Sequence, residues 1–228
     1  MQLDRKPKPT IHLEDPAGAT QTPGPTLALG RAHEATGPAA LAFAALIAAA
    51  LSGPILWVRP AWARSALNPE GLAAFFDPAR LVTAHADRPL DILWAAEEAL
   101  RSGAAPFVVA EAAEPPALTP LRRLQLAAEA GGDAAKAIGA GGRPPLCLLL
   151  PPAPGRSGAV ETRWRCDPSP SSGPGAATGE DRPYPPQHGD APGGFHTTPR
   201  WRFERTYAKG GAPMIWEAGG RALSVLAA

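Results

Sequence analysis

The sequence has little cysteine and almost no net charge, and each shortage excludes a class of protein. Its two cysteines, Cys147 and Cys166, lie far apart in no ligand-type spacing, so neither a disulfide framework nor a metal site is expected. Both are interpreted as buried thiols. The 22 basic and 21 acidic side chains nearly cancel, so no global field directs this 228-residue chain to nucleic acid or membrane. Any contact with either must be local.

Long apolar runs are also missing. The alanine-rich run 39–51 is shorter than a membrane span, and a buried amphipathic helix is the better interpretation. The basic segment 1–9 is not followed by an apolar stretch, so no signal peptide is predicted. We therefore expect a cytoplasmic protein without membrane contact.

Proline and glycine are abundant but unevenly distributed. Residues 1–25 are polar and proline-rich, and residues 167–199 contain 8 prolines and 6 glycines. Both segments lack the apolar content that offsets ordering entropy, so we predict a disordered N-terminal tail and a flexible insertion. Residues 131–142 are predicted to form a third, glycine-rich loop. The remainder of 26–226 is expected to be a single domain.

Between these segments, short apolar runs alternate with helical patterns. Strands are predicted at 55–58, 81–84, 107–110 and 146–150, and helices at 41–51, 69–76, 89–102 and 119–130. This order predicts an α/β fold with a mainly parallel sheet flanked by helices on both faces. Residues 162–166, 200–208 and 213–218 alternate polar with apolar side chains, which indicates C-terminal antiparallel strands. Gly210-Gly211 is a hairpin turn signal.

The segment 30–44 resembles the opening of the phosphate-binding loop of the RecA recombinase, with Gly37-Pro38 at the start of the loop. In such a loop, backbone N–H groups hold the phosphates, a lysine reaches them, and a threonine or serine binds Mg²⁺. Laid on that pattern without gaps, Ala42 stands at the second glycine, Phe43 at the lysine and Ala44 at the threonine. Phe43 is also expected to fill volume that the phosphates need. We therefore predict no ATP hydrolysis and no bound cofactor.

A second segment, 101–120, resembles the RecA stretch that carries the Walker B aspartate, and Glu111 takes the place of that aspartate. Without a lysine or threonine opposite it, Glu111 is interpreted as a polar strand end rather than a metal ligand. The catalytic glutamate should follow the strand 55–58, but residues 59–62 contain no carboxylate. Three parts of the ATPase machinery are thus altered or missing.

Together these segments resemble the RecA-like inducible-mutagenesis protein A family, also called SulA-like, over roughly residues 26–226 except the insertion. The resemblance rests on Gly30-Arg31, Gly37-Pro38 and the segments 55–58, 94–103, 122–129, 162–165 and 201–217. It implies a degenerate RecA-like core and a non-catalytic adaptor in SOS-induced translesion synthesis. The implied partners are a Y-family polymerase-like protein, the RecA recombinase and an error-prone DNA polymerase. Binding to them would bring the protein to the nucleoid.

Arginines alternate with tryptophans in the two later strands and form a candidate DNA or partner face. Its members are Arg163, Arg165, Arg200, Arg202 and Arg205. If the strands pair, these arginines are expected to share a face and contact phosphates and bases. The alternative is an ordinary solvated sheet face with Trp164 and Trp201 turned inward.

Several functions therefore stay open beside the adaptor. An autonomous DNA-binding protein would use the arginine face, and a residual nucleotide hydrolase would use Glu111. The SulA-like label also suggests a cell-division inhibitor. Residues 25–29 occupy the place where RecA relatives dock a neighbouring subunit, so a homo-oligomer is a further alternative.

Overall fold

Short apolar runs at 55–58, 107–110 and 146–149 form central strands of one nine-stranded sheet. The computed structural model describes residues 9–13, 24–140, 142–170, 200–219 and 222–225. The strands lie in the order β11-β10-β9-β8-β3-β7-β6-β4-β5, parallel from β8 to β5 and antiparallel from β9 to β11. Their bounds are β3 Ala32–Thr36, β4 Ile55–Pro60, β5 Leu81–Ala86, β6 Phe107–Ala110, β7 Leu146–Leu149, β8 Thr162–Ser169, β9 Arg200–Ala208, β10 Met214–Gly219 and β11 Ala222–Val225.

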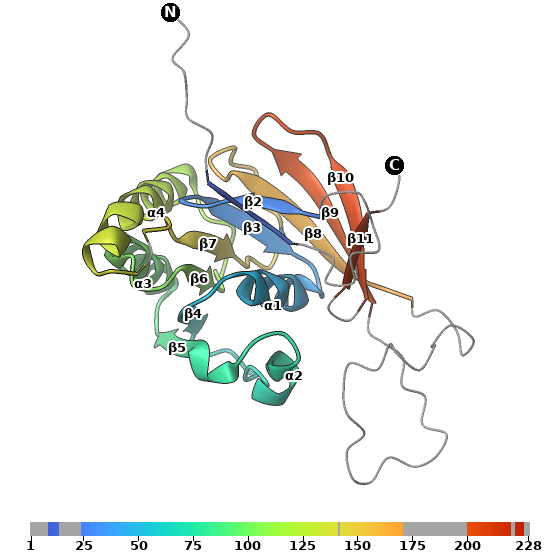
Figure 1. Ribbon diagram of the computed structural model, residues 1–228, viewed down its shortest axis with the longest axis horizontal. Helices are drawn as coiled ribbons and strands as arrows, with labels where there is room; N and C mark the ends of the chain where they lie inside the picture. Colours follow the sequence, from blue (N-terminus) through green and yellow to red (C-terminus); the bar gives the residue numbers. More distant parts are fainter. Residues whose placement is uncertain (1–8, 14–23, 141, 171–199, 220–221, 226–228) are drawn as a thin grey trace, which may run out of the picture.

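Helices cover both faces of the parallel strands (Figure 1). On one face lie α1 (Ala40–Ala50), the short α2 (Pro69–Ala73) and the 3₁₀ turn η1 (Pro78–Arg80); on the other lie α3 (Pro89–Ser102) and α4 (Leu118–Ala137). Alternation along β4 places Trp57 in the core beneath α1 and Val58 in the core beneath α3 and α4. The predicted α/β architecture with its antiparallel extension is confirmed. Among the described residues, no helix is both long and apolar enough to cross a membrane.

Part of the predicted N-terminal tail is a strand. β1 (Thr10–His12) pairs antiparallel with β2 (Thr26–Ala28), and Ile11 and Leu13 on this segment are buried in the core with α1. Disorder over the whole of 1–25 was therefore a wrong prediction, because two apolar side chains offset the ordering of this short segment. Residues 1–8 and 14–23 of the predicted tail and 171–199 of the predicted insertion lie outside the described residues. The predicted insertion began at Asp167, but Asp167, Pro168 and Ser169 belong to β8.

The segment that contains β1 forms backbone hydrogen bonds with residues 25–29. Leu13 N–H donates to the Pro25 carbonyl at 2.9 Å, and Leu29 N–H donates to the Pro9 carbonyl at 2.8 Å. The segment for which docking of a second copy was an alternative is thus paired within the chain. Self-association through this segment stays a hypothesis.

The second helix of the α3–α4 pair continues where a loop was predicted. α4 runs through Gly131 and Gly132 to Ala137, because both glycines are sites of close packing. A Cβ on Gly131 would collide with the Leu100 carbonyl of α3, and one on Gly132 would lie 2.9 Å from Pro144. Gly103 ends α3 in the left-handed conformation, at a φ of 65°, and its missing side chain makes room for α4. Gly131 and Gly132 thus allow close packing within α4 instead of ending that helix.

Both cysteines are free and buried, as predicted. Burial raises the pKa of the Cys147 thiol to about 12. Burial, together with the neighbouring Asp167 carboxylate, also raises the pKa of the Cys166 thiol. Both thiols are therefore protonated at neutral pH and act as small apolar side chains.

We predict that Gly131→Ala lowers the free energy of unfolding by about 2 kcal/mol, because the added methyl group forces α3 and α4 apart. The measurement is urea unfolding followed by circular dichroism. Gly71→Ala in α2 is the matched control, since a Cβ there meets other atoms no closer than 3.7 Å. That variant should be neutral or slightly more stable. Equal losses in the two variants would contradict the close-packing explanation.

Candidate functional site

The turn between β3 and α1 is too short to surround a phosphate. β3 ends at Thr36 and α1 begins at Ala40, with Ala40 N–H donating to the Gly37 carbonyl at 3.1 Å. Phe43 N–H donates to the Ala39 carbonyl at 3.1 Å, so the positions aligned with the lysine and threonine already belong to the helix. Their backbone N–H groups are turned along the helix and cannot form a loop around an anion.

Gly37 is required by a close contact with β8. Its φ is 101°, a value that favours glycine, and a Cβ there would collide with the Cys166 carbonyl. The same carbonyl accepts a hydrogen bond from Ala39 N–H at 3.0 Å. Gly37 and Pro38 are exposed, but the backbone of β8 closes one side of the turn. The glycine that resembles the start of a phosphate loop thus serves a contact between a turn and a strand.

Phe43 lies in the core rather than in an open loop, which corrects the expectation that it fills phosphate volume. Its side chain is fully buried, and its ring centroid lies 4.9 Å from that of Trp164 and 5.0 Å from that of Phe203. Ala44 is also fully buried and Ala42 is half-buried. Phe43, at the position of the lysine, therefore helps attach α1 to β8 and β9.

Glu111, at the end of β6, is held by two side chains from β4. Its Oε1 accepts a hydrogen bond from Trp57 Nε1 at 2.8 Å and forms an ion pair with Arg59 Nε at 2.7 Å. Arg59 also donates to the Ser65 carbonyl at 2.8 Å. Both charged side chains are largely buried, with 7% of Arg59 and 19% of Glu111 exposed. The carboxylate is thus neutralised by an arginine on the neighbouring strand, where the resemblance led us to look for a catalytic glutamate.

This arrangement can bind the ends of two strands together, but it does not assemble a cation site. In the part of the chain that the structure describes, no group of three or more histidine, cysteine, aspartate or glutamate side chains could hold a metal ion. The role of Arg59 was missed in the sequence. The available signal was a basic residue directly after an apolar strand, with a carboxylate at the end of another strand.

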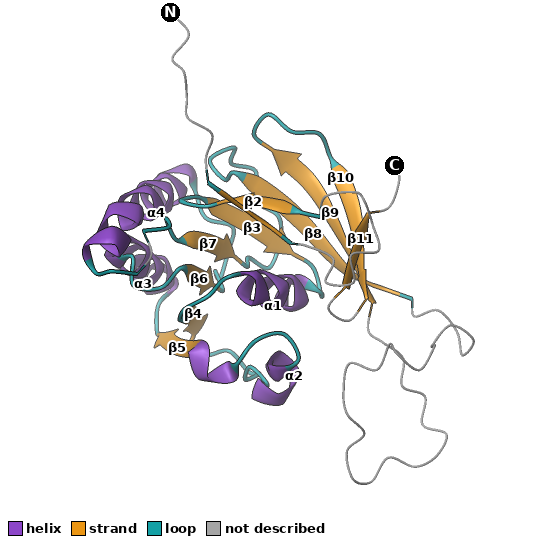
Figure 2. Cartoon of the chain, in the orientation of Figure 1, coloured by secondary structure: helices purple, strands orange, loops and turns teal. Residues whose placement is uncertain are grey.

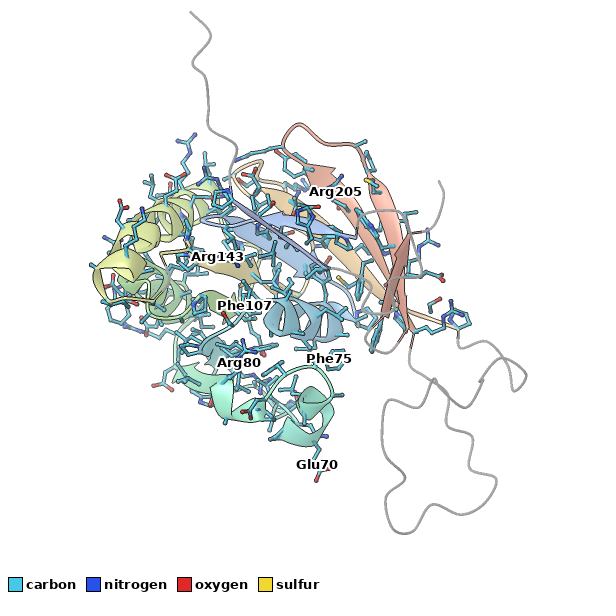
Figure 3. The ribbon with its side chains drawn as sticks, viewed as in Figure 1. Glu70, Phe75, Arg80, Phe107, Arg143 and Arg205 are labelled. Carbon is cyan, nitrogen blue, oxygen red and sulfur yellow. The ribbon has the colours of Figure 1, made fainter. Side chains whose placement is uncertain are left out.

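The arginine face is only partly a shared face. β8 and β9 pair antiparallel, and Arg163, Arg165, Arg200 and Arg202 lie on one side, but Arg205 lies opposite Trp164 on the other. There its guanidinium lies over the Trp164 and Trp216 rings, and burial lowers its pKa. Figure 3 labels Arg205 among the C-terminal strands. The prediction of five arginines on one face was wrong for Arg205. Side chains alternate between the two faces along a strand, and Arg205 is an odd number of residues from Arg200 and Arg202.

Carboxylates accompany the arginines that do share a face. Arg165 Nε lies 2.8 Å from Asp167 Oδ2, and Arg200 lies 3.2 Å from Glu217 Oε2. Arg202 is exposed and pairs in register with Asp167 and Glu217. Trp164 is fully buried, and Trp201 is half-buried against Phe75. A face of mixed charge with its tryptophans turned inward is typical of a solvated sheet surface.

Arg163 is held by a buried glutamate that the sequence did not single out. Glu34, in the middle of β3, is fully buried, and its Oε1 accepts from Arg163 Nε at 2.6 Å and from Gly155 N–H at 2.7 Å. Arg163 also donates to the Ser157 carbonyl at 3.1 Å. This pair fastens the segment that follows β7 onto the sheet. A charged residue in the middle of a strand was the signal for it.

Two curated proteins match the chain, and both have the same name. The chain is 32% identical over 233 residues to "Protein ImuA" from Caulobacter vibrioides, in strains NA1000 / CB15N and ATCC 19089, and the match covers 93% of this chain and 84% of the relative. No protein-family model matches. Two solved structures are more distant. SulA from Pseudomonas aeruginosa is 22% identical, with a TM-score of 0.40 over 54% of this chain and 98% of its own. The RadB recombinase is 9% identical, with a TM-score of 0.49 over 87% and 92%.

The Arg59–Glu111 pair allows a double-mutant test. Arg59→Ala should lower the free energy of unfolding by about 3 kcal/mol, because it leaves a largely buried carboxylate without its cation. Adding Glu111→Ala should recover part of that loss, giving a coupling energy of about 1–3 kcal/mol in chemical denaturation. The more exposed Arg88–Asp91 pair at the start of α3 is the control and should show a coupling below about 1 kcal/mol. Additive losses at Arg59 and Glu111 would contradict the pairing.

Proposed function

The chain belongs to the ImuA family, and from that membership we propose that it is a non-catalytic accessory protein of SOS-induced translesion DNA synthesis. In this role it is an adaptor that links a Y-family polymerase-like partner with the error-prone DNA polymerase and the recombinase at damaged DNA. The protein works in the cytoplasm and associates with the nucleoid through these partners. The function needs binding surfaces and a stable scaffold, and it needs no reaction centre.

The observation that carries the proposal is the start of α1 at Ala40, with Phe43 buried against Trp164 and Phe203. Phosphoryl transfer depends on positioned donors and cations around the transferred group. Here the corresponding positions contribute a helix, a buried aromatic ring and an arginine–glutamate pair. Each supports a structural role, so the proposed activity is assembly rather than catalysis.

The mixed charge of the arginine face favours the adaptor over an autonomous DNA-binding protein. Binding to the phosphate backbone strengthens with each uncompensated cation, and Arg163, Arg165 and Arg200 already have carboxylate partners. A contact with DNA, if the assembly makes one, is therefore proposed to come chiefly from the partners.

A variant that restores the two aligned ATPase residues tests the lost site. Phe43→Lys with Ala44→Thr should not produce ATP hydrolysis, because the new lysine would begin in the core and the helix would still start at Ala40. It should lower the free energy of unfolding by about 3–5 kcal/mol through loss of the buried ring. The control is Leu41→Lys at a position 48% exposed, which should leave stability nearly unchanged. ATP turnover by the wild-type chain or by the restored variant would contradict the non-catalytic proposal.

Co-purification tests the adaptor itself. The full-length chain should elute in size-exclusion chromatography with the polymerase-like partner and with the recombinase, and with both when all three are mixed. Because the proposed role is to bridge, the two partners should co-elute less when the chain is omitted. Failure of the chain to bind either protein would overturn the adaptor.

A further inference from the structure

A groove lies between α4 and the segment that leads into β8. Its volume is about 760 Å³, and it lies at the amino-terminal ends of β3 and β8. The turn that leads into α1 follows the carboxyl end of β3 (Figure 2). The groove residues precede β3 and β8, so the groove is at the opposite end of these strands. None of the residues that resemble nucleotide-binding positions lines it.

The floor of the groove is fixed by polar contacts between its walls. Gln125 of α4 accepts a hydrogen bond from Ala32 N–H at 3.2 Å and donates to the Ala159 carbonyl at 2.7 Å. Arg31 forms ion pairs with Glu129 of α4 and, at 3.5 Å, with Glu161 before β8. The groove therefore exists before anything binds, which lowers the ordering cost of binding.

The walls present apolar side chains and two further cations. Leu118, Arg122 and Leu126 follow one another at four-residue spacing on α4 and form one stripe, with Leu118 47% and Leu126 64% exposed. Within the described residues Arg122 has no ion-pair partner. Lys209, after β9, faces the groove and donates to the Ala159 carbonyl at 3.3 Å. Among the residues that the structure describes, no carboxylate forms an ion pair with Lys209.

We propose that this groove docks a short acidic amphipathic segment of a protein partner. Apolar side chains of that segment contact Leu118 and Leu126, and its carboxylates pair with Arg122 and Lys209. A nucleic-acid strand fits the groove less well, because the exposed Leu118 and Leu126 offer no partner to a phosphate backbone, whereas they suit the apolar side chains of a peptide. The inference rests on the proposed function in that the segment belongs to a protein of the proposed assembly.

The test uses the full-length chain and fluorescent 20-residue peptides tiled across the polymerase-like partner and the recombinase. At least one acidic amphipathic peptide should bind in fluorescence anisotropy. Arg122→Glu and Leu126→Asp should each weaken it about tenfold or more, which corresponds to about 1.4 kcal/mol. Arg64→Glu and Leu90→Asp are matched controls, since Arg64 is exposed after β4 and Leu90 is 73% exposed on α3. The controls should bind with unchanged affinity, and all four variants should keep the wild-type unfolding midpoint.

The outcomes separate the groove from the adaptor. If no acidic peptide binds, or if binding is unchanged by Arg122→Glu and Leu126→Asp, the groove proposal is overturned. The adaptor still stands in either case when the wild-type chain co-elutes with its partners. A single-stranded oligonucleotide that competes with the peptide, and whose own binding is lost in Arg122→Glu but kept in Leu126→Asp, would also overturn the peptide assignment in favour of phosphate recognition.

Discussion

The aromatic contact between α1 and the C-terminal strands holds the two halves of the sheet together. Phe43 of α1 lies against Trp164 of β8 and Phe203 of β9, and Trp164 lies 5.2 Å from Trp216 of β10. Each such ring pair adds about 0.5–1.5 kcal/mol beyond the area it buries. The parallel strands and their antiparallel extension therefore share one core on this face. That constraint explains why α1 must begin close to β3, since a longer loop would withdraw Phe43 from the cluster.

Two buried ion pairs complement this apolar contact. Arg59 with Glu111 joins the ends of β4 and β6, and Arg163 with Glu34 joins β8 to β3. A buried ion pair contributes little net stability compared with a well-packed apolar pair. It favours one alignment of the two strands, because any other alignment would leave a buried charge without its partner. The first pair lies at the ends of its strands, and the second also fastens the segment after β7 through Gly155 and Ser157. Charge that could serve chemistry at the sheet edge is thus committed to positioning backbone.

Local signals predicted much of the fold. α3 begins at Pro89 and ends at Ser102, directly before Gly103, because proline at the first turn and glycine in the left-handed conformation act within a few residues. The continuation of α4 through Gly131 could not be predicted, since the reason for those glycines is contact with α3. β1 was missed for a similar reason, because Ile11 and Leu13 find their partners only after folding.

The candidate site was predictable in identity but not in geometry. Gly37, Phe43 and Glu111 were singled out from their order in the sequence, whereas their contacts with Cys166, Trp164 and Arg59 span strands far apart in the chain. Arg205 differs, because counting by two along β9 already separates it from Arg200 and Arg202. The groove beside α4 combines four separate segments, and no local pattern indicates it.

The central place of β3 has a consequence for how the chain matures. Both neighbours of this early strand are late ones, since β7 starts at Leu146 and β8 starts at Thr162. A chain leaving the ribosome must therefore hold its first core strand and the exposed ring of Phe43 unpaired until most of the protein has been synthesised. Such high contact order slows folding and lengthens the time during which apolar surface is open to aggregation. Correct assembly of this scaffold is thus a late, cooperative event rather than a progressive one.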